Sequence, residues 1–321
     1  MTATCVKETC HEQDTTPEHR KLTVLTVTFW LDRGALQLQA RSLRYFLDPE
    51  MLAEFLLIVS DNDLRMLEFV RTTIVAELGI LADKVCLRSA RDYGLEVQAK
   101  PGWRVQQALK LLAVATASTP VTLILDSKNH LVRPLTLSDL FAGTGKLRSW
   151  KTGHWNHMQP FFEASFAYFG VPFRPHIGAN LPTITPFLAS RRTVRELLAE
   201  IGRREEDGFV PFFLSPGNNV TEFFLLASYI TKQHGSVQYE YEFGPPLGVT
   251  VFDNYVIGNE VNMLIEKLLN ERAPFFALHW AAIPNMTEEQ RRLVTDLWVR
   301  VGLAIPDDAD SLFAGCGRQP T

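Results

Sequence analysis

The segment LILDSKNHLVRP, residues 123–134, places three apolar residues directly before Asp126 and then crowds polar side chains together. With Val121 and Thr122 before it, the apolar run is typical of a strand buried on both faces of a parallel sheet. In open α/β sheets, ligands bind beyond the carboxyl ends of the strands. Asp126 is therefore predicted to stand at the edge of the sheet where a binding site forms.

Strands and helices are predicted to alternate through the first half of the chain. Buried strands are indicated at residues 22–30, 54–63, 84–90 and 121–126, and helices at 35–47, 63–79 and 102–117. Asp63 is the expected cap of the second helix and Gly79 its stop. The alternation predicts an α/β fold with a mostly parallel central sheet. The other strand ends carry Thr28, Asp32, Ser60 and Asp61.

The second half is predicted to be a more irregular elaboration of the same domain. Helices are predicted at residues 193–205, 218–235, 260–272 and 287–303, with Thr287 as the expected N-cap of the last one. Residues 275–280 form a buried strand-like run. No repeat or linker divides the chain. We expect one domain over residues 21–304, a disordered tail at 1–20 and a flexible tail at 305–321.

Composition excludes several classes of protein. The net charge of the 321 residues is −4, so no basic surface indicates a nucleic-acid partner. The four cysteines have no zinc-site spacing and fit a reducing compartment. No signal peptide and no apolar run of about 18 residues is present, which predicts a soluble, cytoplasmic protein.

Three common catalytic or phosphate-binding motifs are absent. The first strand is followed by a single Gly34 rather than by G-x-G-x-x-G. FAGTGKLRS (141–149) has the wrong spacing for a P-loop and lacks the Ser or Thr after Lys146. No G-x-S-x-G elbow occurs. If the acidic strand end binds a phosphate-bearing ligand, it has to do so without these loops.

Five segments carry a resemblance to a known family. They are FWLDRGALQLQARSL (29–43), GWRVQQALKL (102–111), LILDSKNHLVRP (123–134), TEFFLLASYI (221–230) and FFALHW (275–280). In this order and spacing the chain resembles a family of bacterial proteins assigned as glycosyltransferases, long labelled a domain of unknown function, with a GT-A-like fold. The resemblance implies a nucleotide-sugar-binding domain over most of residues 22–303.

The resemblance also implies a divalent metal, Mn²⁺ or Mg²⁺, at Asp126. GT-A enzymes usually carry Asp-x-Asp at a strand end, where the metal neutralises the diphosphate of the donor. Here Lys128 replaces the second acid, so the ligand count is lower and Lys128 could itself supply positive charge. Related GT-A families place a C-terminal histidine on the metal, which makes His279 the second expected ligand. A buried core histidine is the alternative.

Glu222 and Asp126 are the expected catalytic residues. The apolar neighbours of Glu222 would raise its pKa towards a value useful to a general base, although a helix-dipole carboxylate is the alternative. For Gln106 and Lys110, four apart on one helix face, the alternative is a solvated face. The expected donor-binding residues are Thr28, Asp32, Gln106, Lys110, Lys128 and Asn129.

The resemblance predicts an enzyme that transfers sugar from a nucleotide-sugar donor to a glycan or lipid-linked acceptor. The implied setting is bacterial surface polysaccharide or glycoconjugate synthesis, in the cytoplasm, with peripheral association with the inner membrane left open. Sugars stack on tryptophans, so Trp150 or Trp155 is a candidate acceptor platform. Because Lys128 replaces an acid, a catalytically inactive GT-A-fold nucleotide-binding or scaffold protein is the alternative.

Overall fold

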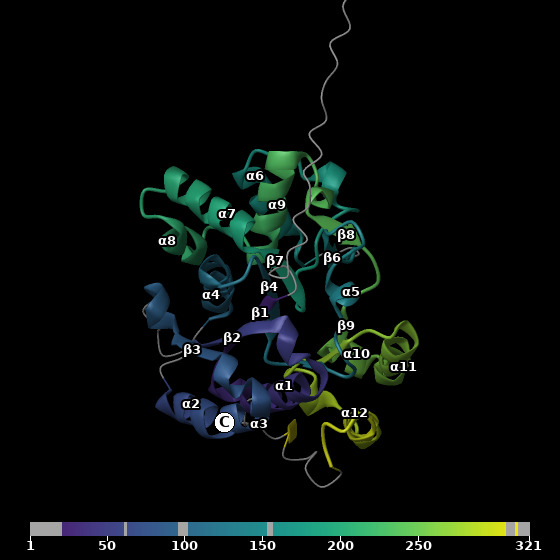
Figure 1. Ribbon diagram of the computed structural model, residues 1–321. Coiled ribbons are helices and arrows are strands. Elements are labelled where there is room, and N and C mark those ends of the chain that lie inside the picture. Colours follow the sequence, from purple (N-terminus) through teal and green to yellow (C-terminus); the bar gives the residue numbers. More distant parts are fainter. Residues whose placement is uncertain (1–20, 61–62, 96–101, 153–156, 306–311, 314–321) are drawn as a thin grey trace, which may run out of the picture.

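The computed structural model describes residues 21–60, 63–95, 102–152, 157–305 and 312–313 (Figure 1). The expected N-terminal tail and most of the expected C-terminal tail lie outside these ranges. Within the C-terminal tail, Leu312 and Phe313 are buried, and the ring of Phe313 lies 4.9 Å from that of Trp298. None of the described helices is long and apolar enough to cross a membrane.

The core of the fold is a mostly parallel five-stranded sheet, as the sequence predicted. Its order is β3-β2-β1-β4-β7. The first four strands run parallel to their neighbours, whereas β7 pairs with β4 in the antiparallel sense and forms one edge. The strands are β1 (Leu22–Thr28), β2 (Leu52–Val59), β3 (Val85–Ser89), β4 (Val121–Asp126) and β7 (Phe187–Ser190). Every residue of β1 is buried, which explains its unbroken apolar and threonine sequence.

Helices surround this sheet, and in Figure 1 α1, α2 and α3 lie below the strands, α7 and α9 lie above them, and α4 lies to the left of β4. The long helices match the predicted segments within a few residues. The helices are α1 (Arg33–Phe46), α2 (Leu64–Phe69), α3 (Val75–Leu78), α4 (Trp103–Thr116), α5 (Leu137–Leu140), α6 (Gln159–Tyr168), α7 (Arg191–Arg204), α8 (Phe209–Leu214), α9 (Glu222–His234), α10 (Asp253–Ile257), α11 (Val261–Glu271) and α12 (Glu288–Arg300).

Local capping follows the predicted signals. The side chain of Asp63 accepts a hydrogen bond from the Arg65 N–H at the start of α2. Gly79 ends the segment with a φ of 55°, which favours glycine, and a Cβ there would lie 2.8 Å from the Arg44 side chain. Thr287 forms a capping box with Gln290 at the start of α12. A π-helical turn at Val70–Ile74 separates α2 from α3 within the single predicted helix.

Two smaller sheets complete the second half, and of their short strands the sequence predicted β10 alone, as the strand-like run at residues 275–280. One sheet has the order β5-β10-β9 and the other pairs β6 with β8. The second of the two hydrophobic clusters surrounds the first of these sheets and includes Trp298. The bounds are β5 (Asn129–Leu131), β6 (Leu147–Ser149), β8 (Tyr241–Phe243), β9 (Gly248–Val251) and β10 (Phe275–Leu278). Since β5 begins three residues after β4 ends, the loop at Asp126 joins the two sheets.

Candidate active site

A cavity of about 430 Å³ opens at the carboxyl ends of β1 and β4. Parts of the chain far apart in sequence form its walls, from the end of β1 to the residues that follow β10. The predicted site residues that line it are Asp32, Gln106, Lys110, Asp126, Lys128, Glu222 and His279. The structure thus has a cavity lined by these residues beyond the strand ends, where the sequence predicted a site.

The turn after β4 is held by buried amide side chains. Asn129 Oδ1 accepts from the Asp126 N–H at 2.7 Å and from Thr185 Oγ1 at 2.6 Å. Asn129 Nδ2 donates to the Thr185 carbonyl at 3.2 Å. From α1, Gln39 Nε2 donates to the carbonyls of Asp126 and Asn129 at 2.8 and 2.9 Å. The backbone of Asp126 is thus fixed, and its carboxylate is directed by the fold.

Replacing Asn129 with alanine is expected to lower the free energy of unfolding by about 3 kcal/mol, because three buried hydrogen bonds are lost and the Asp126 N–H is left without its acceptor. Urea denaturation measures this loss. Asn262→Ala is the matched control, since the exposed Asn262 bonds only to Glu266 on its own helix. Equal stabilities for the two variants would contradict the structural role of Asn129.

Two lysines and two carboxylates meet on the floor of the cavity. Lys110 Nζ from α4 lies 2.7 Å from Asp126 Oδ1 and 3.4 Å from Glu222 Oε1. Lys128 Nζ contacts the other oxygen, Oδ2, of Asp126. Lys110 and Glu222 are buried, whereas the Asp126 side chain is 29% exposed. Both oxygens of Asp126 are therefore engaged by ammonium groups.

Burial and charge move the pKa values of this cluster in opposite directions. Burial alone favours the neutral form of Asp126, but Lys110 and Lys128 outweigh it and hold the pKa of that carboxyl well below its usual range. Burial alone would also lower the pKa of Lys110, yet Asp126 and Glu222 raise it. Burial raises the pKa of Glu222 to about 6, with Lys110 opposing the shift. Of the two carboxylates, Glu222 is the one that can exchange a proton near neutral pH.

His279 lies in the same cavity as Asp126, although 153 positions separate them. The reason is the antiparallel pairing of β10 with β5, in which Ala277 faces Asn129. Burial, with a smaller contribution from the Lys128 charge, lowers the pKa of His279 to about 4, so the ring is neutral at neutral pH. Its Nδ1 accepts from the Ala281 N–H at 3.3 Å, which assigns the proton to Nε2. In this tautomer neither ring nitrogen offers a free lone pair.

The cavity residues do not fit a divalent metal in this arrangement. Among the described residues, no group of three or more His, Cys, Asp or Glu side chains could hold a metal ion. Asp126 already bonds to two ammonium groups. A divalent ion about 4 Å from one ammonium is repelled by on the order of 8 kcal/mol at an effective dielectric constant of about 20. The expected pairing of Asp126 and His279 as ligands is not supported by this chemistry.

Thr28 and Asn129, expected among the donor contacts, are instead fully buried and do not line the cavity. Thr28 Oγ1 accepts from Ser127 Oγ at 3.0 Å. His130 is likewise buried, and its Nε2 accepts from Trp298 Nε1 at 2.8 Å, which ties β5 to α12. These polar residues follow a strand end because the buried turn needs hydrogen-bond partners.

Other residues line the cavity that were not among the predicted site residues, and they include two tryptophans and Gln107. Trp150, a candidate platform, is buried elsewhere, and Trp155 lies outside the described residues. The indoles at the cavity are those of Trp103 and Trp280, which are 50% and 39% exposed. Gln107 also lines it, and its Oε1 is buried without a hydrogen-bond partner in the structure. The signal for Gln107 was its position beside Gln106 on an otherwise apolar helix.

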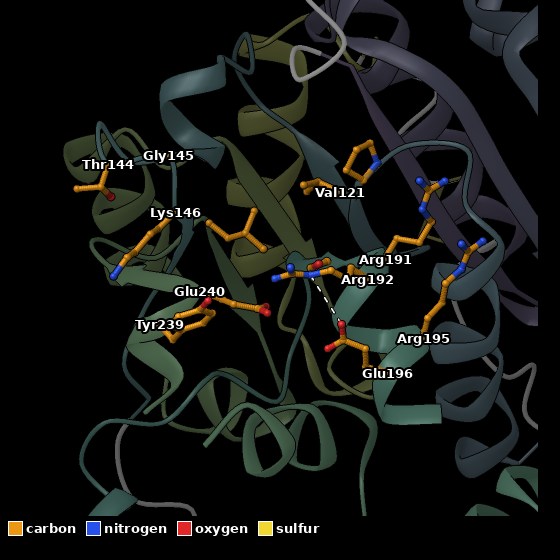
Figure 2. A pocket seen from close by; sticks show the side chains of 13 residues that line it. Val121, Thr144, Gly145, Lys146, Arg191, Arg192, Arg195, Glu196, Tyr239 and Glu240 are labelled. Atoms are coloured by element: carbon orange, nitrogen blue, oxygen red, sulfur yellow. Dashed lines mark ion pairs between the residues drawn. The ribbon is translucent and has the colours of Figure 1, made fainter. Parts of the chain in front are cut away.

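A second cavity, of about 720 Å³, lies at the opposite end of β4 (Figure 2). It is lined by arginines at the start of α7 and by Lys146. Arg191 donates to the Ala117 and Ser118 carbonyls. In Figure 2, Arg192 and Glu196 face each other in an ion pair of 3.9 Å. Although this cavity is larger, it lies away from the carboxyl edge, and its Arg192–Glu196 pair is exposed rather than buried like Lys110 and Glu222.

The fold and the first cavity together define an α/β protein with a cavity lined by charged side chains at the carboxyl edge of its sheet. A family model described as a family of unknown function (DUF6492) matches residues 30–242, and the chain belongs to this family. The predicted resemblance to a family of unknown function is confirmed to that extent. A comparison with curated proteins finds no match.

Three solved structures to which the chain is similar are glycosyltransferases by name. The apo form of the bifunctional WbbM is 11% identical with a TM-score of 0.48, over 92% of this chain and 52% of that one. The galactosyltransferase LgtC, with donor and acceptor sugar analogues, is 10% identical with a TM-score of 0.47, over 91% and 100%. Mouse xyloside xylosyltransferase 1 is 12% identical with a TM-score of 0.42, over 80% and 97%. The chain spans about half the length of WbbM.

Proposed function

We propose that this protein is a GT-A-like glycosyltransferase that takes a sugar from a nucleotide-sugar donor and passes it to a glycan or another hydroxyl-bearing acceptor. The observation that carries the proposal is the cluster of Lys110, Lys128, Asp126 and Glu222 at the carboxyl edge of a parallel sheet. Sugar-nucleotide transfer needs positive charge for the leaving phosphate and a base for the acceptor, and this cluster has both.

In the proposed reaction Glu222 is the general base. The acceptor hydroxyl attacks the anomeric carbon, the bond from that carbon to the phosphate oxygen breaks, and the hydroxyl proton passes to Glu222. A carboxyl whose pKa is about 6 is mostly ionised at neutral pH and still basic enough to receive the proton. Trp103 and Trp280 offer indole faces on which sugar rings can stack. This direct displacement inverts the anomeric configuration.

The test of the proposed function is a binding panel with UDP, GDP, CMP and the corresponding nucleotide sugars, by titration calorimetry with and without Mn²⁺. We expect one nucleotide family to bind with an affinity well above that of the others. Slow hydrolysis of the matching donor in the absence of acceptor then reports catalysis. A panel in which no nucleotide or nucleotide sugar binds would refute the proposal.

A catalytically inactive nucleotide-binding or scaffold protein is the second candidate function. The observation that favours it is the contact of both Asp126 oxygens with lysines, since a self-neutralised cluster can be stable without turning over a donor. Nucleotide binding without any donor hydrolysis, even after prolonged incubation, would support this candidate over the enzyme.

Gln107→Leu is expected to weaken donor affinity about 10-fold while leaving the free energy of unfolding unchanged or raised by up to about 1 kcal/mol. The buried Oε1 of Gln107 has no hydrogen-bond partner among the described residues, so leucine removes an unsatisfied group, whereas a donor hydroxyl would bond to it. Calorimetry and urea denaturation measure the two effects. A variant that loses stability but keeps its affinity would show that Gln107 serves the fold alone.

A further inference from the structure

Two ammonium groups occupy the position where a GT-A-like site would be expected to hold its metal. Lys128 stands two residues after Asp126, and Lys110 arrives from α4 on the other side of the same carboxylate. The Nζ atoms contact different oxygens, Oδ2 and Oδ1, so the carboxylate holds the two charges apart at fixed positions. Both lysines and Asp126 line the cavity, so an incoming ligand meets two ammonium groups that share one carboxylate between them.

We infer that Lys110 and Lys128, aligned by Asp126, neutralise the phosphate groups of the nucleotide donor in place of a divalent cation. This inference rests on the proposed function and deepens it, because it names the part of the donor that the cluster binds. Each ammonium has three donor hydrogens, so a lysine that bonds to Asp126 can also bond to a phosphate oxygen. Lysine is a common phosphate ligand that acts as a point charge.

Asp126 is then a positioning residue rather than a metal ligand. Its two oxygens are already used by the lysines, and its backbone is fixed by Asn129 and Gln39. Glu222 adds a second anchor for Lys110 from α9 at 3.4 Å. The lysines are thereby placed before a ligand arrives, which lowers the cost of ordering two long side chains on binding.

The two roles of Asp126 predict opposite effects for Asp126→Asn. If Asp126 binds a metal, the amide removes the charged ligand and nucleotide affinity falls. If Asp126 only aligns the lysines, the amide keeps one acceptor oxygen for them and removes a negative charge beside the phosphates, so metal-free affinity is kept or increases. Lys128→Met removes one of the two positive charges and is expected to weaken binding in either buffer.

The experiment is titration of UDP, GDP, CMP and inorganic pyrophosphate into the full chain, in EDTA and in Mn²⁺. We expect affinities in the two buffers to agree within about 3-fold, Asp126→Asn to bind at least as tightly as wild type, and Lys128→Met to bind about 10-fold more weakly. Lys146→Met is the matched control, because this lysine lines the other cavity and bonds to the Gln238 carbonyl. Its affinity is expected to equal that of wild type.

The outcomes separate this inference from the proposed function. Nucleotide binding that appears only with Mn²⁺, or that Asp126→Asn abolishes, overturns the inference and leaves the glycosyltransferase proposal standing. Pyrophosphate binding in EDTA without any nucleotide binding supports the lysine site and refutes the proposed function. Loss of binding in Lys146→Met but not in Lys128→Met would move the anion site to the other cavity and overturn the inference. No binding of any probe refutes both.

Discussion

Replacing Glu222 with glutamine is expected to slow sugar transfer by roughly 10²- to 10⁴-fold, which is the usual contribution of a general base. Nucleotide affinity should stay within about 3-fold of wild type, because the lysines and Asp126 remain in place. The rate is measured with the donor that the binding panel selects, by following release of the free nucleotide. A variant that keeps more than about a tenth of the activity would lose under roughly 1.4 kcal/mol of transition-state stabilisation and would remove Glu222 from the base role.

The pH dependence gives a second readout of the same group. Because Glu222 must be ionised to accept a proton, the wild-type rate should rise with pH through about 6 and then level off. The contribution of Glu222 to stability runs the other way. A carboxyl whose pKa is raised on folding stabilises the protein fully below its unfolded pKa, near 4.5, and this stability is lost as the pH rises through about 6.

Glu222→Gln should therefore gain stability relative to wild type as the pH rises. The shift of the Glu222 pKa from 4.5 to about 6 corresponds to about 2 kcal/mol between acid and neutral conditions. Urea denaturation of both proteins at pH 4 and pH 8 measures the change. A stability difference that does not vary with pH would show that Glu222 does not titrate in this range.

Replacing Lys110 with methionine is expected to lower the free energy of unfolding by about 3–5 kcal/mol at neutral pH, the usual result of breaking a buried ion pair. The variant leaves Asp126 and Glu222 without the ammonium group that lies 2.7 and 3.4 Å from their oxygens. Glu222 should respond by staying protonated to a higher pH, so part of the loss is recovered in acid. Urea denaturation at pH 5 and pH 8 checks both effects.

Lys232→Met is the matched control for this prediction. Lys232 pairs with Glu200 at 2.9 Å, but it is partly exposed, and Glu200 keeps contacts with two arginines. Its loss should be under about 1 kcal/mol. If Lys110→Met and Lys232→Met lower the free energy of unfolding equally, the buried cluster stabilises the fold no more than a partly exposed ion pair does.

The sequence could predict the position of this cavity because the end of a buried strand is visible in local sequence alone. An apolar run that stops at Asp126 places that residue at the carboxyl edge, whatever packs around it. The helix patterns likewise placed Gln106 and Lys110 on one face. Each prediction uses the sequence of a single element, an apolar run for Asp126 and a four-residue spacing for Gln106 and Lys110. The structure places all three residues at one cavity.

What the sequence could not show depends on contacts between elements. That Lys110 joins Asp126 to Glu222 follows from the packing of α4 beside α9, which no local pattern contains. Thr28 and Asn129 look like ligand contacts in sequence, but a buried turn needs the same polar groups. The proton position on His279 is set by the Ala281 N–H, two residues away across a turn. The antiparallel edge strand β7 has only 4 residues, too few to show a period.

Two separate parts of the chain form the walls of the cavity. Its charged floor comes from residues within 30–242, the part that matches the family model, whereas Phe252, Leu278, His279 and Trp280 stand beyond it. Leu278 of this second group belongs to the sheet β5-β10-β9 and to the second hydrophobic cluster, to which β5 and Val132 from the family part also contribute. Substitutions of Trp280 or Phe252 can therefore change the shape of the cavity without removing a contact of Lys110 or Lys128. In the proposed enzyme, selectivity for the acceptor can therefore be engineered separately from the charged residues on the floor.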